Sequence, residues 1–155
     1  MTLKNGESAM NDIILVSGGF DPIHSGHIAL IQEAAKLGDV VVLLNSDNWL
    51  QEKKGKEFLS FKEREIIMSS IKKVIDVISF DDSNKTCING IKQTLLKYPS
   101  HKIKFANGGD RNNATTPNTE TTFCNENNVE ILWGIGGKHK ANSSSLILKR
   151  WNDLS

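Results

Sequence analysis

Short apolar runs alternate with longer segments of helical spacing through most of the chain. The apolar runs, each of strand length, cover residues 13–16, 40–44, 74–80, 103–106 and 129–133. Helical patterns lie between and after them, at residues 25–37, from 60 onward, at 86–98, at 117–127 and from 143 onward. Strands that alternate with helices are typical of a parallel sheet covered on both faces. The pattern therefore predicts an α/β fold with a parallel sheet of about five strands.

Residues that start or stop helices mark several of these boundaries. Gly38 follows the first helical segment and predicts a C-terminal cap there. Ser60, with Glu63 three residues later, has the pattern of a capping box. Pro99 marks the end of the helical segment at residues 86–98. In such sheets ligands bind beyond the carboxyl ends of the strands, where the winding reverses. Each polar cluster described below follows one of those predicted ends.

Length and charge narrow the class of protein. The 155 residues contain no internal repeat or low-complexity linker, so we expect a single domain over residues 12–155 and a disordered extension over residues 1–11. Lys and Arg number 19 against 18 Asp and Glu, and a net charge of +1 gives no broad field for nucleic acid or a membrane surface. No apolar run approaches the roughly 20 residues of a membrane span. Cys87 and Cys124 form no paired motif, which favours reduced, buried thiols in a cytoplasmic protein.

The stretch GGFDPIHSGH, residues 18–27, joins the first predicted strand to the first predicted helix. Gly18 and Gly19 permit a ligand to approach the backbone, and the first N–H groups of a helix attract an anion. His24 and His27 are three positions apart, so they project from one side of the first helical turn. A lone histidine more often satisfies the core or the surface. Two of them after a strand-ending Gly-Gly pair indicate a phosphate-binding site.

A basic segment follows the second predicted strand. Lys53, Lys54 and Lys56 flank Gly55, and we expect them to form a mobile cationic loop over a bound anion. Arg64, just inside the next helix, offers a planar charged group suited to phosphate. The alternative interpretations are a solvated charged loop and an ordinary surface arginine.

Two further clusters follow the fourth and fifth predicted strands. Residues 108–111, Gly-Gly-Asp-Arg, allow close backbone approach and add a carboxylate for hydroxyl or amino groups and a guanidinium for an anion. A plain glycine turn with a local salt bridge is the alternative. Residues 138–145, KHKANSSS, lead into the last helix, where serine hydroxyls and free N–H groups could hold phosphate or merely cap the helix.

Together these motifs resemble the small nucleotidyltransferases of the HxGH class, over residues 13–150. GGFDPIHSGH matches that family's G-x-F-D-x-x-H-x-G-H, KLGDVVVLLNSD at 36–47 resembles its second strand and turn, and NSSSLI at 142–147 stands for its Ser/Thr signature. The chain looks most similar to glycerol-3-phosphate cytidylyltransferases and to the adenylyltransferase domain that acts on heptose 1-phosphate. Class I aminoacyl-tRNA synthetases share the first motif but are much longer chains.

The resemblance implies a Rossmann-like, doubly wound sheet and a cytoplasmic homodimer. It implies transfer of CMP or AMP from CTP or ATP to a phosphorylated polyol or sugar phosphate, with release of pyrophosphate. The implied catalytic residues are His24, His27, Lys53 and Lys56. The implied nucleotide-binding residues are Gly18, Gly19, Phe20, Gly109, Asp110, Arg111, Lys138, Asn142, Ser143, Ser144 and Ser145. The implied substrate-binding residues are Asp21, Lys54, Arg64 and Lys72.

The implied chemistry needs neither a covalent intermediate nor a general base, because a phosphate oxygen of the acceptor is already an adequate nucleophile. Positioning and charge stabilisation then carry the rate. We expect Mg²⁺ to be carried by the nucleotide phosphates, without a metal-ligand cluster of the protein. GGFDPIHSGH, with SFKER at 60–64 and NSSSL, is also similar to pantetheine-phosphate and nicotinamide-mononucleotide adenylyltransferases. A catalytically silent nucleotide-binding module on the same scaffold is the alternative of a different class.

Overall fold

A computed structural model of the chain describes residues 2–3, 6–7, 10–108, 118–136 and 143–153. Its centre is a five-stranded sheet in the order β5-β4-β3-β6-β7, and every neighbouring pair of strands is parallel. The strands are β3 (Ile13–Gly18), β4 (Asp39–Leu44), β5 (Val74–Ser79), β6 (Ile103–Gly108) and β7 (Glu130–Ile135). The predicted α/β fold with a doubly wound parallel sheet is confirmed.

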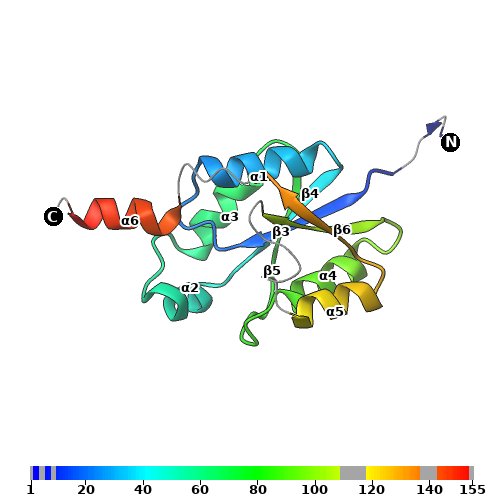
Figure 1. The fold of residues 1–155 in the computed structure, drawn as a ribbon. Coiled ribbons are helices and arrows are strands. Elements are labelled where there is room, and N and C mark those ends of the chain that lie inside the picture. Colours follow the sequence, from blue (N-terminus) through cyan, green and yellow to red (C-terminus); the bar gives the residue numbers. More distant parts are fainter. Residues whose placement is uncertain (1, 4–5, 8–9, 109–117, 137–142, 154–155) are drawn as a thin grey trace.

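Helices cover both faces of the sheet (Figure 1). They are α1 (Ser25–Ala35), α2 (Asp47–Lys54), α3 (Phe61–Ser69), α4 (Ile88–Lys97), α5 (Asn118–Glu126) and α6 (Ser144–Asp153). In Figure 1, α1 and α3 lie on one face, α4 and α5 lie on the other, and α6 projects away from the sheet. Two short strands, β1 (Thr2–Leu3) and β2 (Gly6–Glu7), pair with each other in a separate sheet. Disorder of residues 1–11 and the domain boundary at residue 12 stay predictions.

Alternation along the central strand explains how one sheet supports two hydrophobic cores. Ile13 and Leu15 of β3 pack with α4 and α5, while Ile14 and Val16 pack with α1 and α3. All four side chains are completely buried. A strand buried on both faces must be apolar at every position, which is why residues 13–16 read as a continuous apolar run.

The winding of the sheet reverses at β3, which pairs with β4 on one side and with β6 on the other. The chain therefore crosses over one face after β3 and over the opposite face after β5. The carboxyl ends of β3 and β6 leave a crevice between them, because the connections that follow them run to opposite faces.

Gly38 does not cap the first helix, contrary to the prediction from its position. The helix ends at Ala35, and its C-cap Lys36 has ordinary right-handed dihedral angles. A Cβ atom on Gly38 would lie 2.2 Å from the carbonyl oxygen of Asp12. The glycine is therefore required by close approach of the chain before β4 to the chain before β3, where the Asp39 N–H also donates to the Asp12 carbonyl.

Arg64 is a buried structural residue, which corrects its prediction as a substrate-binding group. Its side chain has no solvent exposure, although it lies in the first turn of α3. Nη1 donates to the carbonyl oxygens of Gly19 at 3.0 Å and Asn45 at 2.8 Å. Nε donates to the Leu59 carbonyl oxygen at 3.0 Å, and Nη2 lies 2.7 Å from Asp47 Oδ1. The guanidinium thus joins the ends of two strands to the loop before α3.

Replacing Arg64 with Met should lower the free energy of unfolding by about 3–5 kcal/mol, because three buried or partly buried carbonyls and Asp47 would lose a charged donor. Arg64→Lys should recover only part of the loss, since an ammonium cannot span the same partners. Urea unfolding at pH 7 measures both. The control is Lys62→Met in the same helix, whose side chain is 78% exposed, with an expected change within about 0.5 kcal/mol. Equal stability of the Arg64 and Lys62 variants would contradict the structural role.

Candidate functional site

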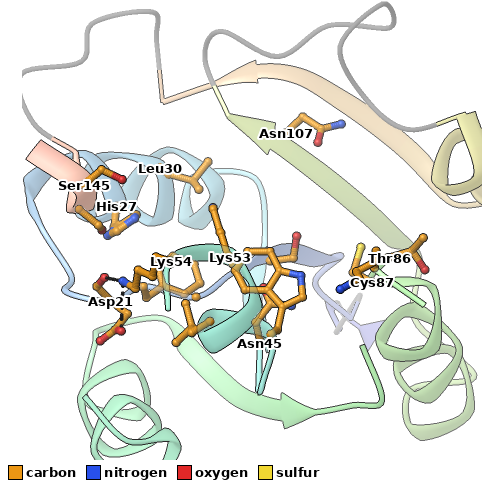
Figure 2. A pocket seen from close by; sticks show the side chains of 18 of the residues that line it. Asp21, His27, Leu30, Asn45, Lys53, Lys54, Thr86, Cys87, Asn107 and Ser145 are labelled. Atoms are coloured by element: carbon orange, nitrogen blue, oxygen red, sulfur yellow. Dashed lines mark hydrogen bonds and ion pairs between the residues drawn. The ribbon is translucent and has the colours of Figure 1, made fainter. Parts of the chain in front are cut away.

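A cavity of about 410 Å³ lies at the carboxyl ends of β3, β4 and β6. Figure 2 shows that its residues form two sides. Asp21, His27 and Ser145 lie on one side, and Thr86, Cys87 and Asn107 on the other. The residues that line it from the strand ends are Ser17, Gly18, Gly19, Phe20, Asn45, Ala106 and Asn107. The cavity therefore occupies the crevice where the winding of the sheet reverses.

His24 and His27 begin α1 by capping each other's backbone. His24 is the N-cap, and its Nδ1 accepts the Gly26 N–H at 3.0 Å, while Nδ1 of His27 accepts the His24 N–H at 3.2 Å. This is the reciprocal arrangement of a capping box, with imidazoles in place of the usual hydroxyl and carboxylate. Because Nδ1 is the acceptor in both rings, a neutral imidazole must carry its proton on Nε2. Each histidine thus keeps an Nε2–H donor for another group.

Packing holds His27 in its neutral form. Its ring stacks on His24, with centroids 3.8 Å apart, and meets the ring of Phe20 edge-on at 4.8 Å. Burial, followed by the charge on His24, lowers the pKa of His27 to about 4. Burial also lowers the pKa of His24. Phe20 is buried with a φ of 51°, an uncommon conformation for a bulky residue, so the turn accepts strain to place this ring against His27.

The basic segment forms the end of a helix and not the mobile loop predicted for it. Lys53 and Lys54 are the last residues of α2, and Gly55 ends the helix with a φ of 89°. Lys53 Nζ lies 4.7 Å from the centre of the Trp49 ring, one turn earlier in the same helix. Both lysines line the cavity. Helical geometry therefore places these two ammonium groups without the closure of a loop.

Asp21 ties this helix end to the turn after β3. Its carboxylate accepts the N–H groups of Phe58 at 2.6 Å and Leu59 at 2.7 Å, and Lys54 Nζ lies 3.2 Å from Oδ2. Lys54 also donates to the Asp21 carbonyl oxygen. Asp21 is only 2% exposed and lines the cavity. Its carboxylate therefore fixes the loop before α3 and also forms part of the cavity wall.

Two other predicted lysines lie apart from the cavity. Lys56 follows the end of α2, is exposed and is not among the cavity-lining residues. Lys72 is exposed just before β5, at the amino edge of the sheet, whereas the cavity lies at the carboxyl edge. The structure therefore does not bear out Lys72 as a substrate-binding residue, because a whole strand length separates the two edges.

The three serines before and in α6 divide their roles. Ser143 acts as a helix cap, since its Oγ accepts the Leu146 N–H at 3.1 Å. Ser144 donates from Oγ to the Pro22 carbonyl oxygen at 2.8 Å, which ties α6 to the turn after β3. Ser144 and Ser145 both line the cavity. Gly109, Asp110, Arg111, Lys138 and Asn142 lie outside the described residues, and their predicted roles stay predictions.

Asp82 fixes the start of α2 through hydrogen bonds from Asn45 and Ser46. The residue is 6% exposed and lies in the loop after β5. Its carboxylate accepts Asn45 Nδ2 at 3.0 Å, the Ser46 N–H at 2.8 Å and Ser46 Oγ at 2.8 Å. Ser46 in turn caps α2 by accepting the Trp49 N–H at 3.0 Å. This chain of contacts sets the direction in which α2 carries its two lysines.

Several cavity residues were not predicted from the sequence. They are Asn45, Trp49, Thr86, Asn107 and Glu120. Asn45 and Asn107 stand at the ends of apolar strands, so the rule that ligands bind at carboxyl ends could have identified them. Thr86 lies in the loop before α4 and Glu120 lies in α5, so neither stands at the end of a strand.

The arrangement suits a phosphorylated ligand on the histidine side. Two Nε2–H donors and two lysines can stabilise an anion there. The Cys87 thiol on the opposite side stays protonated, because burial and the neighbouring Glu120 raise its pKa. Burial also raises the pKa of Cys124 to about 11. Within the described ranges, no three metal-ligating side chains come together, and no helix is long and apolar enough to cross a membrane.

Comparison with known proteins gives related sequences over this region. A family model described as cytidylyltransferase-like matches residues 15–131. The chain is 28% identical over 143 residues to the bifunctional protein HldE of Syntrophotalea carbinolica, covering 90% of this chain and 27% of that protein. It is 34% identical over 98 residues to the bifunctional protein HldE of Helicobacter pylori, covering 61% of this chain and 21% of that protein. The chain spans about a quarter of the length of these relatives.

A solved structure shares the fold. The crystal structure of the lipopolysaccharide core biosynthesis protein from Thermoplasma volcanium matches with a TM-score of 0.63 and 20% identity, over 85% of this chain and all of that one. The family model extends from β3 into β7 and so includes the histidine turn, α2 and the three strands that end at the cavity. The resemblance seen in the motifs is confirmed at the level of the family. The chain belongs to the cytidylyltransferase-like family of nucleotidyltransferases.

Proposed function

We propose that this chain transfers CMP or AMP from CTP or ATP to the phosphate of a phosphorylated polyol or sugar, with release of pyrophosphate. The observation that carries the proposal is the reciprocal cap of His24 and His27, which leaves both Nε2–H groups for a ligand. The ring of His27 lines the cavity, and the His24 ring stacks on it. Two neutral donors side by side suit the oxygens of one phosphate group.

The reaction fits direct in-line attack. An oxygen of the acceptor phosphate forms a bond to the α-phosphorus as the bond to the pyrophosphate oxygen breaks, and the electron pair leaves with pyrophosphate. No proton transfer to a side chain is required, so a histidine with a pKa near 4 can serve as a hydrogen-bond donor at neutral pH. Lys53 and Lys54 would offset the charge that develops on the leaving group and between the two substrates.

We propose that Mg²⁺ arrives with the nucleotide. The described residues bring no three metal ligands together, and the Asp21 carboxylate is already engaged by two N–H groups and Lys54. Such a site fits an ion held by phosphate oxygens and water. When bound, the ion would neutralise part of the triphosphate charge. The chain's own groups would then position the α-phosphate and the acceptor.

The comparisons favour a sugar phosphate as the acceptor. One relative in structure is described as a lipopolysaccharide core biosynthesis protein, and the motifs resemble the adenylyltransferase domain that acts on heptose 1-phosphate. Glycerol 3-phosphate, the acceptor of the other subfamily that the motifs resemble, is the second candidate. Pantetheine phosphate and nicotinamide mononucleotide are outcomes of the same assay, and so is a silent nucleotide-binding module. Assembly as a homodimer is part of the proposal that comes from the sequence resemblance.

Incubation with each NTP, Mg²⁺ and a panel of sugar and polyol phosphates should release pyrophosphate for one pair of substrates. His27→Ala should lower kcat by about 10²- to 10³-fold, because it removes the Nε2–H donor. His27→Gln should lose less activity, because its side-chain amide keeps an N–H donor. Glutamine at the third helical position retains a capping acceptor, so the fold should be kept, as circular dichroism would check. His27→Ala removes both functions. Full activity of His27→Ala would contradict the donor role, and no pyrophosphate release with any substrate pair would contradict the proposed enzymatic activity.

Lys54 and Lys72 form a matched pair of lysine variants. Lys54→Ala should lower kcat/KM by about 10²-fold, because one cation of the cavity is lost. Lys72→Ala should leave kcat/KM within twofold of the unmodified chain, since Lys72 lies at the opposite edge of the sheet. Steady-state kinetics with the active substrate pair measures both. A comparable loss of kcat/KM in the Lys72 variant would show that Lys72 takes part in the site and would contradict its assignment outside it.

Stability should fall with acidity because of His27. Its pKa of about 4 lies below the ordinary 6.5, so between these values the unfolded chain binds a proton that the folded chain does not. The contribution is complete above pH 6.5 and declines as the pH falls towards 4, by about 1–3 kcal/mol. In urea unfolding at pH 7 and pH 5, His27→Gln should lose less stability than the unmodified chain. Parallel losses in the two proteins would show that His27 titrates normally.

A further inference from the structure

Asn107 carries a buried polar group that the proposed reaction does not use. It is the last residue but one of β6 and is 2% exposed. Its Nδ2 finds no hydrogen-bond partner among the residues that the structure describes. Buried amide donors are nearly always paired, so an unpaired one requires an explanation. Asn107 lines the cavity, on the side away from His27 (Figure 2), so a ligand can supply the missing partner.

Glu120 adds an acceptor to the same cavity. This α5 residue is 6% exposed, and its Oε2 accepts the backbone N–H of Cys87 at 2.8 Å. The ion pairs between described residues do not include Glu120. A carboxylate has about four acceptor positions, and the backbone N–H and the thiol of Cys87 occupy two of them. Because Cys87 also lines the cavity, this contact holds the carboxylate beside the space that a ligand would occupy.

The chemistry of the pair selects one kind of ligand group. A phosphate would meet repulsion from the Glu120 carboxylate. An ammonium group would match Glu120 but would leave the Asn107 donor without a partner. A hydroxyl group both donates and accepts, so two hydroxyls on one ligand satisfy both side chains. Ser17 and Thr86 line the same cavity and add two uncharged hydroxyl groups to its lining, which also includes Lys85.

We propose that Asn107 and Glu120 form a hydroxyl-recognition wall, in which the carboxylate accepts from one ligand hydroxyl and the amide donates to another. The hydroxyls can belong to the ribose of the nucleotide or to the carbon chain of the phosphorylated acceptor. The identity of the ligand rests on the proposed function. The wall itself rests on the unpaired amide, the buried carboxylate and their shared cavity.

Calorimetric titration separates the two sources. In the first arm, ATP and CTP with Mg²⁺ are compared with their 2′-deoxy and 3′-deoxy forms. In the second arm, glycerol 3-phosphate and mannose 1-phosphate are compared with propyl and cyclohexyl phosphate, in the presence of α,β-methylene nucleotide. One arm should show a loss of at least tenfold in affinity when the hydroxyls are absent, because a buried polar site rejects a ligand that cannot pair with it. Equal affinities in both arms would overturn the proposal.

Variants assign that discrimination to the two residues. Glu120→Gln, which retains an acceptor for the Cys87 N–H, and Asn107→Leu, which has similar volume, should each reduce the discrimination to less than threefold. Affinity for the hydroxyl-free probes should stay within twofold. Asn89→Leu is the control, because Asn89 Nδ2 donates to the Asp81 carbonyl oxygen at 3.0 Å at an exposed position outside the cavity. Discrimination unchanged by both wall variants would overturn the proposal.

The melting temperature gives a test that needs no ligand. Asn107→Leu should melt at the same or a higher temperature than the unmodified chain, because the amide nitrogen has no hydrogen-bond partner to lose among the described residues. A lower melting temperature would show that the amide is bonded within the protein and would overturn the proposal. Binding is measured without turnover, so hydroxyl discrimination without pyrophosphate release would contradict the proposed reaction and leave the wall supported.

Discussion

The buried guanidinium of Arg64 makes an open cavity compatible with a stable fold. Gly19 and Asn45 follow the last residues of β3 and β4 and line the cavity, and their carbonyl oxygens accept from Arg64. Carbonyl groups buried without donors would be costly. Arg64 satisfies those of Gly19, Asn45 and Leu59 and pairs with Asp47 at the start of α2. One side chain therefore fixes the ends of two strands, a loop and a helix.

The capping hydrogen bonds at the start of α1 also determine which donors its two histidines offer to a ligand. The first N–H groups of any helix need acceptors from outside the helix. Aspartate would supply an acceptor and no donor, and a serine or threonine hydroxyl, as at Ser46, donates only from the same atom that caps the helix. A histidine uses Nδ1 for the cap and retains the opposite nitrogen. Because His24 and His27 cap each other, the requirement of the helix for acceptors determines the tautomer with which both rings face a ligand.

Strands could be predicted from the sequence because burial on both faces makes them continuous apolar runs, and most helices could be predicted because their apolar positions recur with helical spacing. All five apolar runs became strands, and Ser60 began α3 as its capping pattern predicted. The sequence of α2 is dominated by polar residues and buries only Leu50, so it carried little hydrophobic signal. Arg64 showed the limit most clearly. From the sequence, a charged residue in a helix is expected to be exposed or to bind a ligand. The structural role of Arg64 is visible only in three dimensions, where three carbonyl groups lie around its guanidinium. The Asn107 amide nitrogen, which has no hydrogen-bond partner among the described residues, could not be recognised from the sequence either, because pairing depends on neighbours in space.

The pairing of Lys54 with Asp21 has a consequence for how the cavity would receive an anion. Without a ligand, the lysine is balanced by a carboxylate that is itself bonded to the N–H groups of Phe58 and Leu59. If Lys54 turned to a phosphate, Asp21 would retain those two N–H donors, so the buried carboxylate would not be left without partners. The exchange would thus avoid the large penalty of an unpaired buried charge. Anion binding at this helix end would therefore be a change of partner for the lysine, because the backbone of the following loop stabilises the aspartate independently.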